Sequence, residues 1–358
     1  MSTVLTIVPR LPPSTDGVGD YSLYLAQKLR KQFDINTRFI VCDPAWPFQS
    51  EVDGFPVSQL SELSTSELLR CLQNSSEFSH IFLHYVGYGY AKWGCPVWLL
   101  KALSTWRSKS SQVQLVTMFH ELYALPGNKP WKHNFWNSSS QKTLAKQLVK
   151  LSDHTITSSR KYAETIDSFC PYSKSPIRFF PVFSTVGEPP LIKPWADRLP
   201  QLIIFGQASN KQRSYEKSLK EIQSACKRFD IQEIIDVGPP TGLGLKTIGN
   251  VPVHEAGKCS IDEISEIFQN SKLGFFNYNP DYFAKSTIFA AYCAYGLLPI
   301  SPLRSVLPTD GLTPGEHYWV IDETVAMPQS IAQNAHTWYR SHSLEAQTEH
   351  FATLLHTK

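Results

Sequence analysis

The segment after the first apolar run of the sequence combines two glycines with an acid. Val4 to Val8 is followed, beyond a proline-rich stretch, by Gly17, Gly19 and Asp20, which begin a pattern of helical period. Glycines let the backbone approach a ligand closely, and the free N–H groups at a helix start favour an anion. The alternative is a tight turn in which Asp20 only caps the helix. We therefore treat Gly17 and Gly19 as candidate ligand-binding positions and Asp20 as a candidate catalytic group.

Two histidines occur at the ends of neighbouring predicted strands. His84 ends the run 80–84, and His120 follows the run 114–118 with Glu121 beside it. Imidazole can take or give a proton near neutral pH. Because ligands bind beyond the carboxyl ends of parallel strands, these side chains are expected at the ligand-binding edge. We interpret His120 and Glu121, with Asp20, as candidate catalytic residues.

Aromatic residues follow His84 closely. Tyr85, Tyr88 and Tyr90 offer flat apolar faces with hydrogen-bonding rims, which suit stacking against a sugar or another amphipathic acceptor. With His84 and Trp131 they form the predicted acceptor-binding set. The alternative for each ring is a place in the core, which is common for aromatic residues.

The second half of the chain holds two clusters that suit an anion. Lys211 and Arg213 follow a predicted strand and could clamp a phosphate through charge-assisted hydrogen bonds, or could be solvated surface charges. Lys285, Ser286 and Thr287 stand where another helix begins. A cation and two hydroxyls beside a helix start predict a second anion site. The two halves together suggest a ligand held between two domains.

Short apolar runs alternate with segments of helical period, and these elements must position the residues above. The predicted strands of the first half are 4–8, 37–41, 80–84, 114–118, 155–157 and 178–180. Those of the second half are 202–205, 233–237, 273–277, 298–301 and 318–321. Helices are expected at about 214–229, 260–270 and 285–295, and a terminal helical segment at 328–356 breaks near 341–343. This alternation predicts an α/β fold with a parallel sheet covered on both faces in each half.

One stretch interrupts the alternation. Residues 184–200 carry four prolines and a glycine, so they cannot hold a regular element. We expect an N-terminal domain over 1–185, a linker over 186–200, a C-terminal domain over 201–327 and a helical segment over 328–358.

The composition excludes several classes of protein. The chain has 358 residues, with 34 Lys and Arg against 31 Asp and Glu, a net charge of +3. That charge is too small for a dedicated polyanion binder, so no nucleic-acid partner is expected. No apolar run reaches the roughly 18–20 residues that span a bilayer, and the N-terminus lacks a signal-peptide pattern. We expect a cytoplasmic protein with no transmembrane segment. Peripheral contact with a membrane is compatible with this expectation. The seven cysteines form no Cys-x-x-Cys pair and are expected to be reduced thiols.

In order along the chain, three segments resemble GT-B glycosyltransferases, especially bacterial ones allied to the large retaining group. They are the loop and helix 16–29, the Phe119-His-Glu-Leu-Tyr123 segment, and the helix 285–296. The resemblance implies two Rossmann-like domains with parallel sheets facing across a cleft. It also implies that a nucleotide-sugar donor, UDP- or GDP-linked, is held mainly by the second domain. The terminal helical segment would then cross back and pack on the N-terminal domain.

The same resemblance assigns roles to matching positions. Gly17 and Gly19 would lie near the donor diphosphate and the acceptor, and His120 near the transferring sugar. The donor diphosphate would be contacted by Lys211 or Arg213 and by 285–287, and the nucleobase would be approached by 253–257, which includes His254. Two glutamates of many retaining members are replaced by Phe283 and Ala291. This departure leaves Asp20 as a candidate base for an inverting reaction.

Motifs of other reaction classes are missing from the sequence. It contains no Asp-x-Asp, which holds the metal–diphosphate of the other large glycosyltransferase fold. The segment 238–244 lacks the lysine of a nucleoside-triphosphate loop, and His120-Glu121 lacks the second histidine of a zinc-protease helix. We predict a glycosyltransferase without metal or cofactor, which acts on an unidentified small-molecule, glycan or lipid-linked acceptor. The alternatives are a sugar-nucleotide epimerase and a non-catalytic nucleotide-sugar-binding protein.

Overall fold

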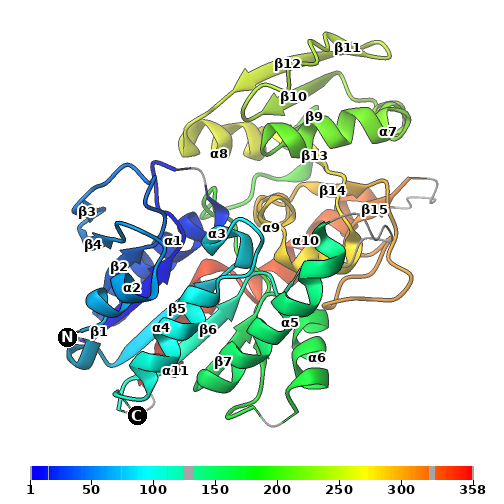
Figure 1. Cartoon of the computed structure of the whole chain (residues 1–358). Coiled ribbons are helices and arrows are strands. Elements are labelled where there is room, and N and C mark those ends of the chain that lie inside the picture. The colour runs from blue at the N-terminus through cyan, green and yellow to red at the C-terminus, as the bar shows by residue number, and fades with distance from the viewer. Residues whose placement is uncertain are drawn as a thin grey trace. The chain divides into compact units, whose positions relative to one another are not determined.

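The structure is a computed structural model that describes residues 2–14, 16–73, 75–110, 112–123, 133–171, 173–321 and 327–356. The chain divides into two compact units (Figure 1). Unit 1 comprises Met1–Pro181 together with Gln347–Lys358, and unit 2 comprises Val182–Ala346.

Within the described residues, unit 1 is built on an eight-stranded sheet in the order β3-β4-β2-β1-β5-β6-β7-β8. All neighbouring strands run parallel except β3 and β4. The strands are β1 Ser2–Val8, β2 Ile35–Val41, β3 Glu51–Val52, β4 Phe55–Gln59, β5 His80–Tyr85, β6 Gln114–Phe119, β7 His154–Thr157 and β8 Arg178–Phe179.

Helices cover both faces of this sheet. They are α1 Gly17–Phe33, α2 Thr65–Cys71, α3 Gly87–Tyr90, α4 Val97–Arg107, α5 His133–Leu151, α6 Arg160–Phe169 and α11 Leu344–His356, with a 3-10 turn η1 at Ser75–Glu77. One core packs α2, α4, α5 and α6 against the sheet, and a second packs α1 against β1, β2 and β4. On the α1 side, Phe351 of α11 packs against Phe82 of β5.

The alternation of side chains along β5 decides what each strand-end residue touches. Successive residues of a strand point to opposite faces. Ile81, Leu83 and Tyr85 join the core beneath α4 and α5, whereas Phe82 and His84 point to the face that carries α1 and α11. His84 and Tyr85, adjacent in sequence, therefore lie on opposite faces of the sheet.

Unit 2 repeats the plan with a seven-stranded sheet in the order β11-β12-β10-β9-β13-β14-β15. Only β11 and β12 pair antiparallel in that described sheet. Its strands are β9 Leu199–Phe205, β10 Glu233–Val237, β11 Thr247–Ile248, β12 Val251–Gly257, β13 Ser271–Phe275, β14 Leu298–Ser301 and β15 Trp319–Val320. Its helices are α7 Ala208–Arg228, α8 Ile261–Asn270, α9 Thr287–Ala294 and α10 Pro328–Arg340, with 3-10 turns η2 Trp195–Asp197 and η3 Pro280–Lys285.

The α/β class and the two parallel sheets confirm the expectation from the sequence, and several details differ. Helix α7 begins at Ala208, so Lys211 and Arg213 lie inside it and not in the loop before it. The strands β3, β4, β11 and β12 were not predicted. The two units meet in sequence at Pro181 and Val182, and the whole stretch expected as a linker lies in unit 2.

The terminal helical segment is divided between the units. Helix α10 belongs to unit 2, where Nδ1 of His336 bonds the carbonyl oxygen of Cys293 at 3.0 Å. Only Gln347–Lys358 groups with unit 1. The break that separates α10 from α11 lies at 341–343, as expected.

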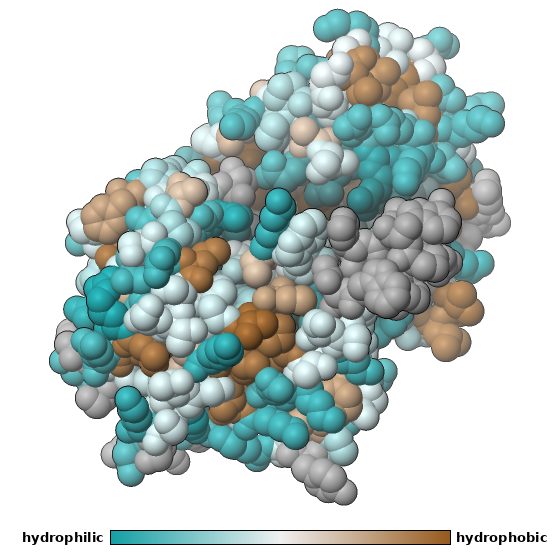
Figure 2. Space-filling view, in the orientation of Figure 1, coloured by the Kyte–Doolittle hydropathy of each residue, from teal (hydrophilic) through white to brown (hydrophobic). Residues whose placement is uncertain are grey.

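Apolar side chains are gathered inside the units. The face drawn in Figure 2 is mostly hydrophilic or neutral, with hydrophobic residues in small groups. No helix among the described residues is long and apolar enough to cross a membrane.

Candidate functional site

The loop between β1 and α1 is fixed by Asp16. Its Oδ1 accepts hydrogen bonds from the backbone N–H groups of Val18 (2.9 Å) and Gly19 (3.1 Å), which makes Asp16 the N-cap of α1. Arg10 links the loop further, because its guanidinium contacts Asp16 at 3.3 Å and Asp43 at 2.6 Å. The alternative in which Asp20 caps the helix is therefore wrong: Asp20 lies one turn too far along.

Gly19 and Gly17 differ in what surrounds them. A Cβ atom at Gly19 would come within 2.4 Å of the carbonyl oxygen of Arg10, so only glycine fits there. A Cβ atom at Gly17 would meet nothing within 4 Å. Gly19 thus serves the close approach of the loop to the helix, whereas Gly17 borders open space in which a ligand could approach the backbone.

Asp20 has the perturbed titration expected of a catalytic carboxyl. The side chain is half-buried in the first turn of α1. Burial, and to a lesser extent the charge of Asp16, raise the pKa of Asp20 to about 6. A carboxyl with such a pKa changes protonation state close to neutral pH, where a general acid or base is most effective.

His84 and His120 are brought together at the adjacent ends of β5 and β6. Nδ1 of His84 lies 3.0 Å from Nε2 of His120. Tyr21 of α1 packs edge-on against both rings, with centroid distances of 5.8 Å to His84 and 5.2 Å to His120. Asp20 precedes Tyr21 in the chain, so the first turn of α1 adjoins the two histidines.

Most of the predicted acceptor-binding set does not reach the surface. Tyr85 and Tyr90 are fully buried on the other face of the sheet, where their rings stack on each other. The Tyr90 hydroxyl donates to the carbonyl oxygen of His84 at 2.7 Å. His84 itself is 1 % exposed. The acceptor role predicted for these three residues is corrected, because core packing leaves them no surface for a ligand.

Tyr88 is the member of that set which the structure exposes. Its side chain is 42 % exposed, and the neighbouring Trp93, in a loop after α3, is 48 % exposed. Both are held by the buried Gln141 of α5, whose amide donates to the Tyr88 hydroxyl (3.3 Å) and to the carbonyl oxygen of Trp93 (2.9 Å). Glu121 is half-buried after β6. Trp131 lies outside the described residues.

In unit 2, glycine turns bring three strand ends together. Gly206 follows β9, Gly238 follows β10 and Gly257 ends β12, all with positive φ. The N–H of Gly238 donates to the carbonyl oxygen of Gly257 at 2.7 Å. A Cβ atom at Gly238 would lie 2.3 Å from the carbonyl oxygen of Gly206, so only glycine allows these two turns to pack this closely, whereas a Cβ atom at Gly257 would meet nothing within 4 Å.

Lys211 of α7 connects this helix to β10 and to the turn that follows β10. Its ammonium is 1 % exposed, is paired with the carboxylate of Asp236, and donates to the carbonyl oxygen of Gly238 at 3.1 Å. The other carboxylate oxygen of Asp236 accepts from the Tyr215 hydroxyl at 2.6 Å. The phosphate-binding role predicted for Lys211 is corrected, because its charge is already neutralised inside the fold. No pattern in the sequence marked Asp236 as its partner.

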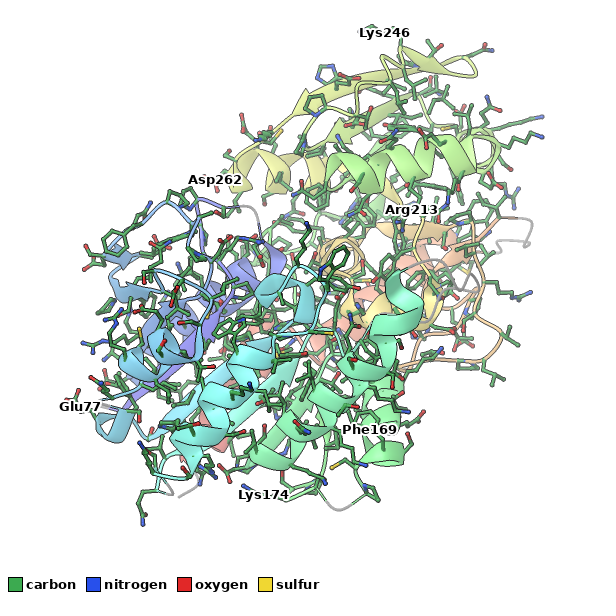
Figure 3. All side chains as sticks on the ribbon, in the orientation of Figure 1. Glu77, Phe169, Lys174, Arg213, Lys246 and Asp262 are labelled. Carbon is green, nitrogen blue, oxygen red and sulfur yellow. The ribbon has the colours of Figure 1, made fainter. Side chains whose placement is uncertain are left out.

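The other donor ligands predicted in unit 2 differ in exposure, from the exposed Arg213 and His254 to the buried Ser286. Arg213, labelled in Figure 3, is exposed on α7, and His254 is exposed on β12. Ser286 is the N-cap of α9, because its Oγ accepts from the N–H of Phe289 at 3.2 Å. Lys285 and Thr287 flank it and are half-buried, with the Lys285 ammonium 5.8 Å from the centre of the Tyr282 ring. The start of α9 therefore combines a cation, a hydroxyl and the backbone N–H groups of a helix N-terminus.

The described residues contain no group of three or more His, Cys, Asp or Glu side chains that could hold a metal ion. Of the cations predicted as donor ligands, Arg213 is exposed and Lys285 is half-buried, whereas Lys211 is buried in its ion pair.

Known structures share this fold. The sequence matches no protein-family model and no curated protein. The whole chain is similar to the whole of an alpha-glucosyltransferase solved in complex with UDP, at 11 % identity and a TM-score of 0.60. It is also similar to a structure described as trehalose-6-phosphate from E. coli bound with UDP-2-fluoro glucose, at 9 % identity and a TM-score of 0.61, over 99 % of each chain. A third, S. aureus MnaA with UDP, has 10 % identity and a TM-score of 0.50 over 97 % of this chain and 91 % of the other. The chain therefore has the GT-B fold.

Proposed function

We propose that the protein is a glycosyltransferase that moves a sugar from a nucleoside-diphosphate sugar to an acceptor without a metal ion. The observation that carries the proposal is the likeness of the entire chain to GT-B structures that hold UDP or a UDP-sugar. Asp20 supports it, because burial raises the pKa of this carboxyl to about 6, which suits a general acid or base near neutral pH.

Unit 2 would bind the donor. Gly257 at the end of β12 borders open space and gives backbone access, and Lys285 with the N-terminus of α9 suits the diphosphate. Negative charge develops on the departing diphosphate during transfer, and a fixed ammonium and oriented N–H groups stabilise that charge. Arg213 would reach the diphosphate from α7, and His254 would contact the base. UDP is the first donor nucleotide to test, because it is the nucleotide held by the similar structures.

Unit 1 would supply the proton chemistry. As a carboxylate, Asp20 accepts the proton of the acceptor hydroxyl while the oxygen of that hydroxyl forms a bond to the anomeric carbon. The bond from that carbon to the diphosphate breaks, and the nucleoside diphosphate leaves with the electron pair. The positions that carry glutamates in many retaining enzymes hold Phe283 and Ala291, both buried and apolar, so no carboxylate stands there. This favours an inverting reaction.

The exposed pair Tyr88 and Trp93 would bind the acceptor through a ring face. The acceptor is proposed to be a small molecule, a glycan or a lipid-linked sugar and not a nucleic acid. One similar alpha-glucosyltransferase was solved with UDP and a 13-mer DNA containing a HMU base, at a TM-score of 0.57. DNA with that base therefore belongs in the acceptor panel.

The test is release of nucleoside diphosphate from a panel of UDP- and GDP-sugars in EDTA, with wild type, Asp20→Asn and Asp34→Asn. We expect release from one donor, and a loss of about 100- to 10,000-fold in Asp20→Asn, the range for a general base. Asp34→Asn, an exposed acid at the other end of α1, should match wild type. Isomerisation of the donor without an acceptor would point to an epimerase, and tight UDP binding without turnover to a non-catalytic protein.

A further inference from the structure

We propose that His84 is a positioning residue that holds the ring of His120 in one orientation and one tautomer. The proposal rests on the proposed function and on the place near the transferring sugar that the resemblance predicts for His120. It starts from the contact between the two imidazoles, in which Nδ1 of His84 lies 3.0 Å from Nε2 of His120. That distance is a hydrogen bond, and it fixes which nitrogen of His120 faces inward.

The two histidines differ in access. His84 is 1 % exposed and His120 is 9 % exposed, at the end of the neighbouring strand. Phe82 packs against His84 with ring centres 4.3 Å apart, and Tyr21 covers both imidazoles edge-on. His84 cannot touch a substrate from this position, so any effect that it has on the reaction passes through His120.

The aromatic cover is itself anchored by the end of the chain. The Tyr21 hydroxyl donates to Oε1 of Gln347 at 2.5 Å, and the amide of Gln347 donates to the carbonyl oxygen of Pro181 at 2.6 Å. Phe351 of α11 packs against Phe82 with ring centres 5.1 Å apart. Tyr21 and Phe82, the rings that border His84, thus both contact α11, and together they hold the His84 imidazole in one position.

The chemistry of two neutral imidazoles defines the consequence. Burial, with a smaller contribution from the neighbouring His120, lowers the pKa of His84 well below its usual range, so His84 is neutral and carries one N–H. A neutral imidazole has one donor and one acceptor nitrogen, and the hydrogen bond needs one of each. Because the bond engages Nε2 of His120, it sets the protonation of that nitrogen and with it the protonation of Nδ1 on the same ring. The partner of one ring nitrogen commonly sets the tautomer of a working histidine in this way.

The test combines a direct view of the tautomer with kinetics. In 15N-labelled protein, long-range proton–nitrogen NMR of the His120 ring, assigned with His120→Gln, should show one tautomer in wild type. It should show a mixture of tautomers in His84→Ala. In His84→Asn, whose amide can replace Nδ1 as a bonding partner, one tautomer should persist. The kcat for donor hydrolysis should fall by about 10- to 100-fold in His84→Ala, which is the range for removing a hydrogen-bond partner that orients a metal-ligating side chain. KM for the donor should stay within about 2-fold of wild type.

Two comparisons keep a structural effect apart from a positioning effect. Tyr21→Phe removes the bond to Gln347 but leaves the ring against both histidines, so it should keep the wild-type tautomer and kcat. His84→Asn should recover most of the kcat that His84→Ala loses. A wild-type tautomer in His84→Ala, or equal loss of kcat in His84→Asn and His84→Ala, would overturn the proposal. If the wild-type protein turns over no donor, the proposed function fails, and the NMR comparison alone still decides the role of His84.

Discussion

Replacing Asp20 by asparagine should stabilise the protein at neutral pH and leave its stability unchanged in acid. Burial raises the pKa of Asp20 from 3.8 to about 6, a shift of about two units or roughly 3 kcal/mol. The folded state therefore favours the protonated carboxyl. The stability that the protonated Asp20 contributes is complete below about pH 4 and is lost as the pH rises through 6. Asparagine resembles the protonated form at every pH. It loses an interaction of about 0.3–1 kcal/mol with the N-terminus of α1, so the net gain at pH 7.5 should be about 2–3 kcal/mol.

Urea unfolding followed by tryptophan fluorescence at pH 4 and pH 7.5 measures this difference. Asp34→Asn is the matched control, because Asp34 is exposed at the C-cap of the same helix in a left-handed conformation that asparagine tolerates. It should change the free energy of unfolding by less than about 0.5 kcal/mol at both pH values. The reasoning would be wrong if Asp20→Asn were less stable than wild type at pH 7.5, or if it changed the free energy of unfolding equally at both pH values. Either result would show that the folded state does not disfavour the ionised form of Asp20.

Three further predictions concern the phosphate ligand, the buried pair and the glycine loop. Lys285→Ala should weaken binding of the nucleoside diphosphate by about 10- to 150-fold and leave the bare nucleoside nearly unchanged in calorimetric titration. Lys211→Met should lower the free energy of unfolding by about 3–5 kcal/mol, because it leaves Asp236 buried without its cation. Gly19→Ala should cost about 1–3 kcal/mol in urea unfolding, since its Cβ would meet a carbonyl oxygen at 2.4 Å, whereas Gly17→Ala should be tolerated.

The two-sheet fold could be predicted because its central strands are buried on both faces. Such strands are continuous apolar runs, as in Val4 to Val8. The helix expected at about 260–270 is α8, which begins with a capping box formed by Ser260 and Glu263. The strands that were missed are edge elements or nearly so. β3 has two residues, and β12 is largely exposed, so neither carries an apolar run. The sequence pattern that predicts a strand is weakest at the edge of a sheet and in the strand next to it.

The candidate site could be located from the sequence, but its contacts could not. Parallel strands end at one edge, so His84 and His120 were expected together, and they are. Whether a strand-end residue is exposed depends on the helices that cover its face of the sheet, and here helices bury both His84 and Tyr85. The burial of Lys211 depends on Asp236 on a different strand, a partner that periodicity does not reveal. The sequence suggested Asp20 as a possible cap of this helix, whereas the cap is Asp16, because the helix begins at Gly17.

The measurement that tests the central claim most directly is proton and phosphorus NMR of nucleotide sugars incubated with the protein in EDTA. Signals of the sugar anomeric proton and of the diphosphate follow the donor and both of its products in one sample. We expect one UDP- or GDP-sugar to lose its anomeric signal while free nucleoside diphosphate accumulates, and Asp20→Asn to suppress both changes. An intact panel in EDTA that reacts only when a divalent metal is restored would contradict the metal-independent mechanism, and a panel intact under both conditions would contradict the assignment as a glycosyltransferase.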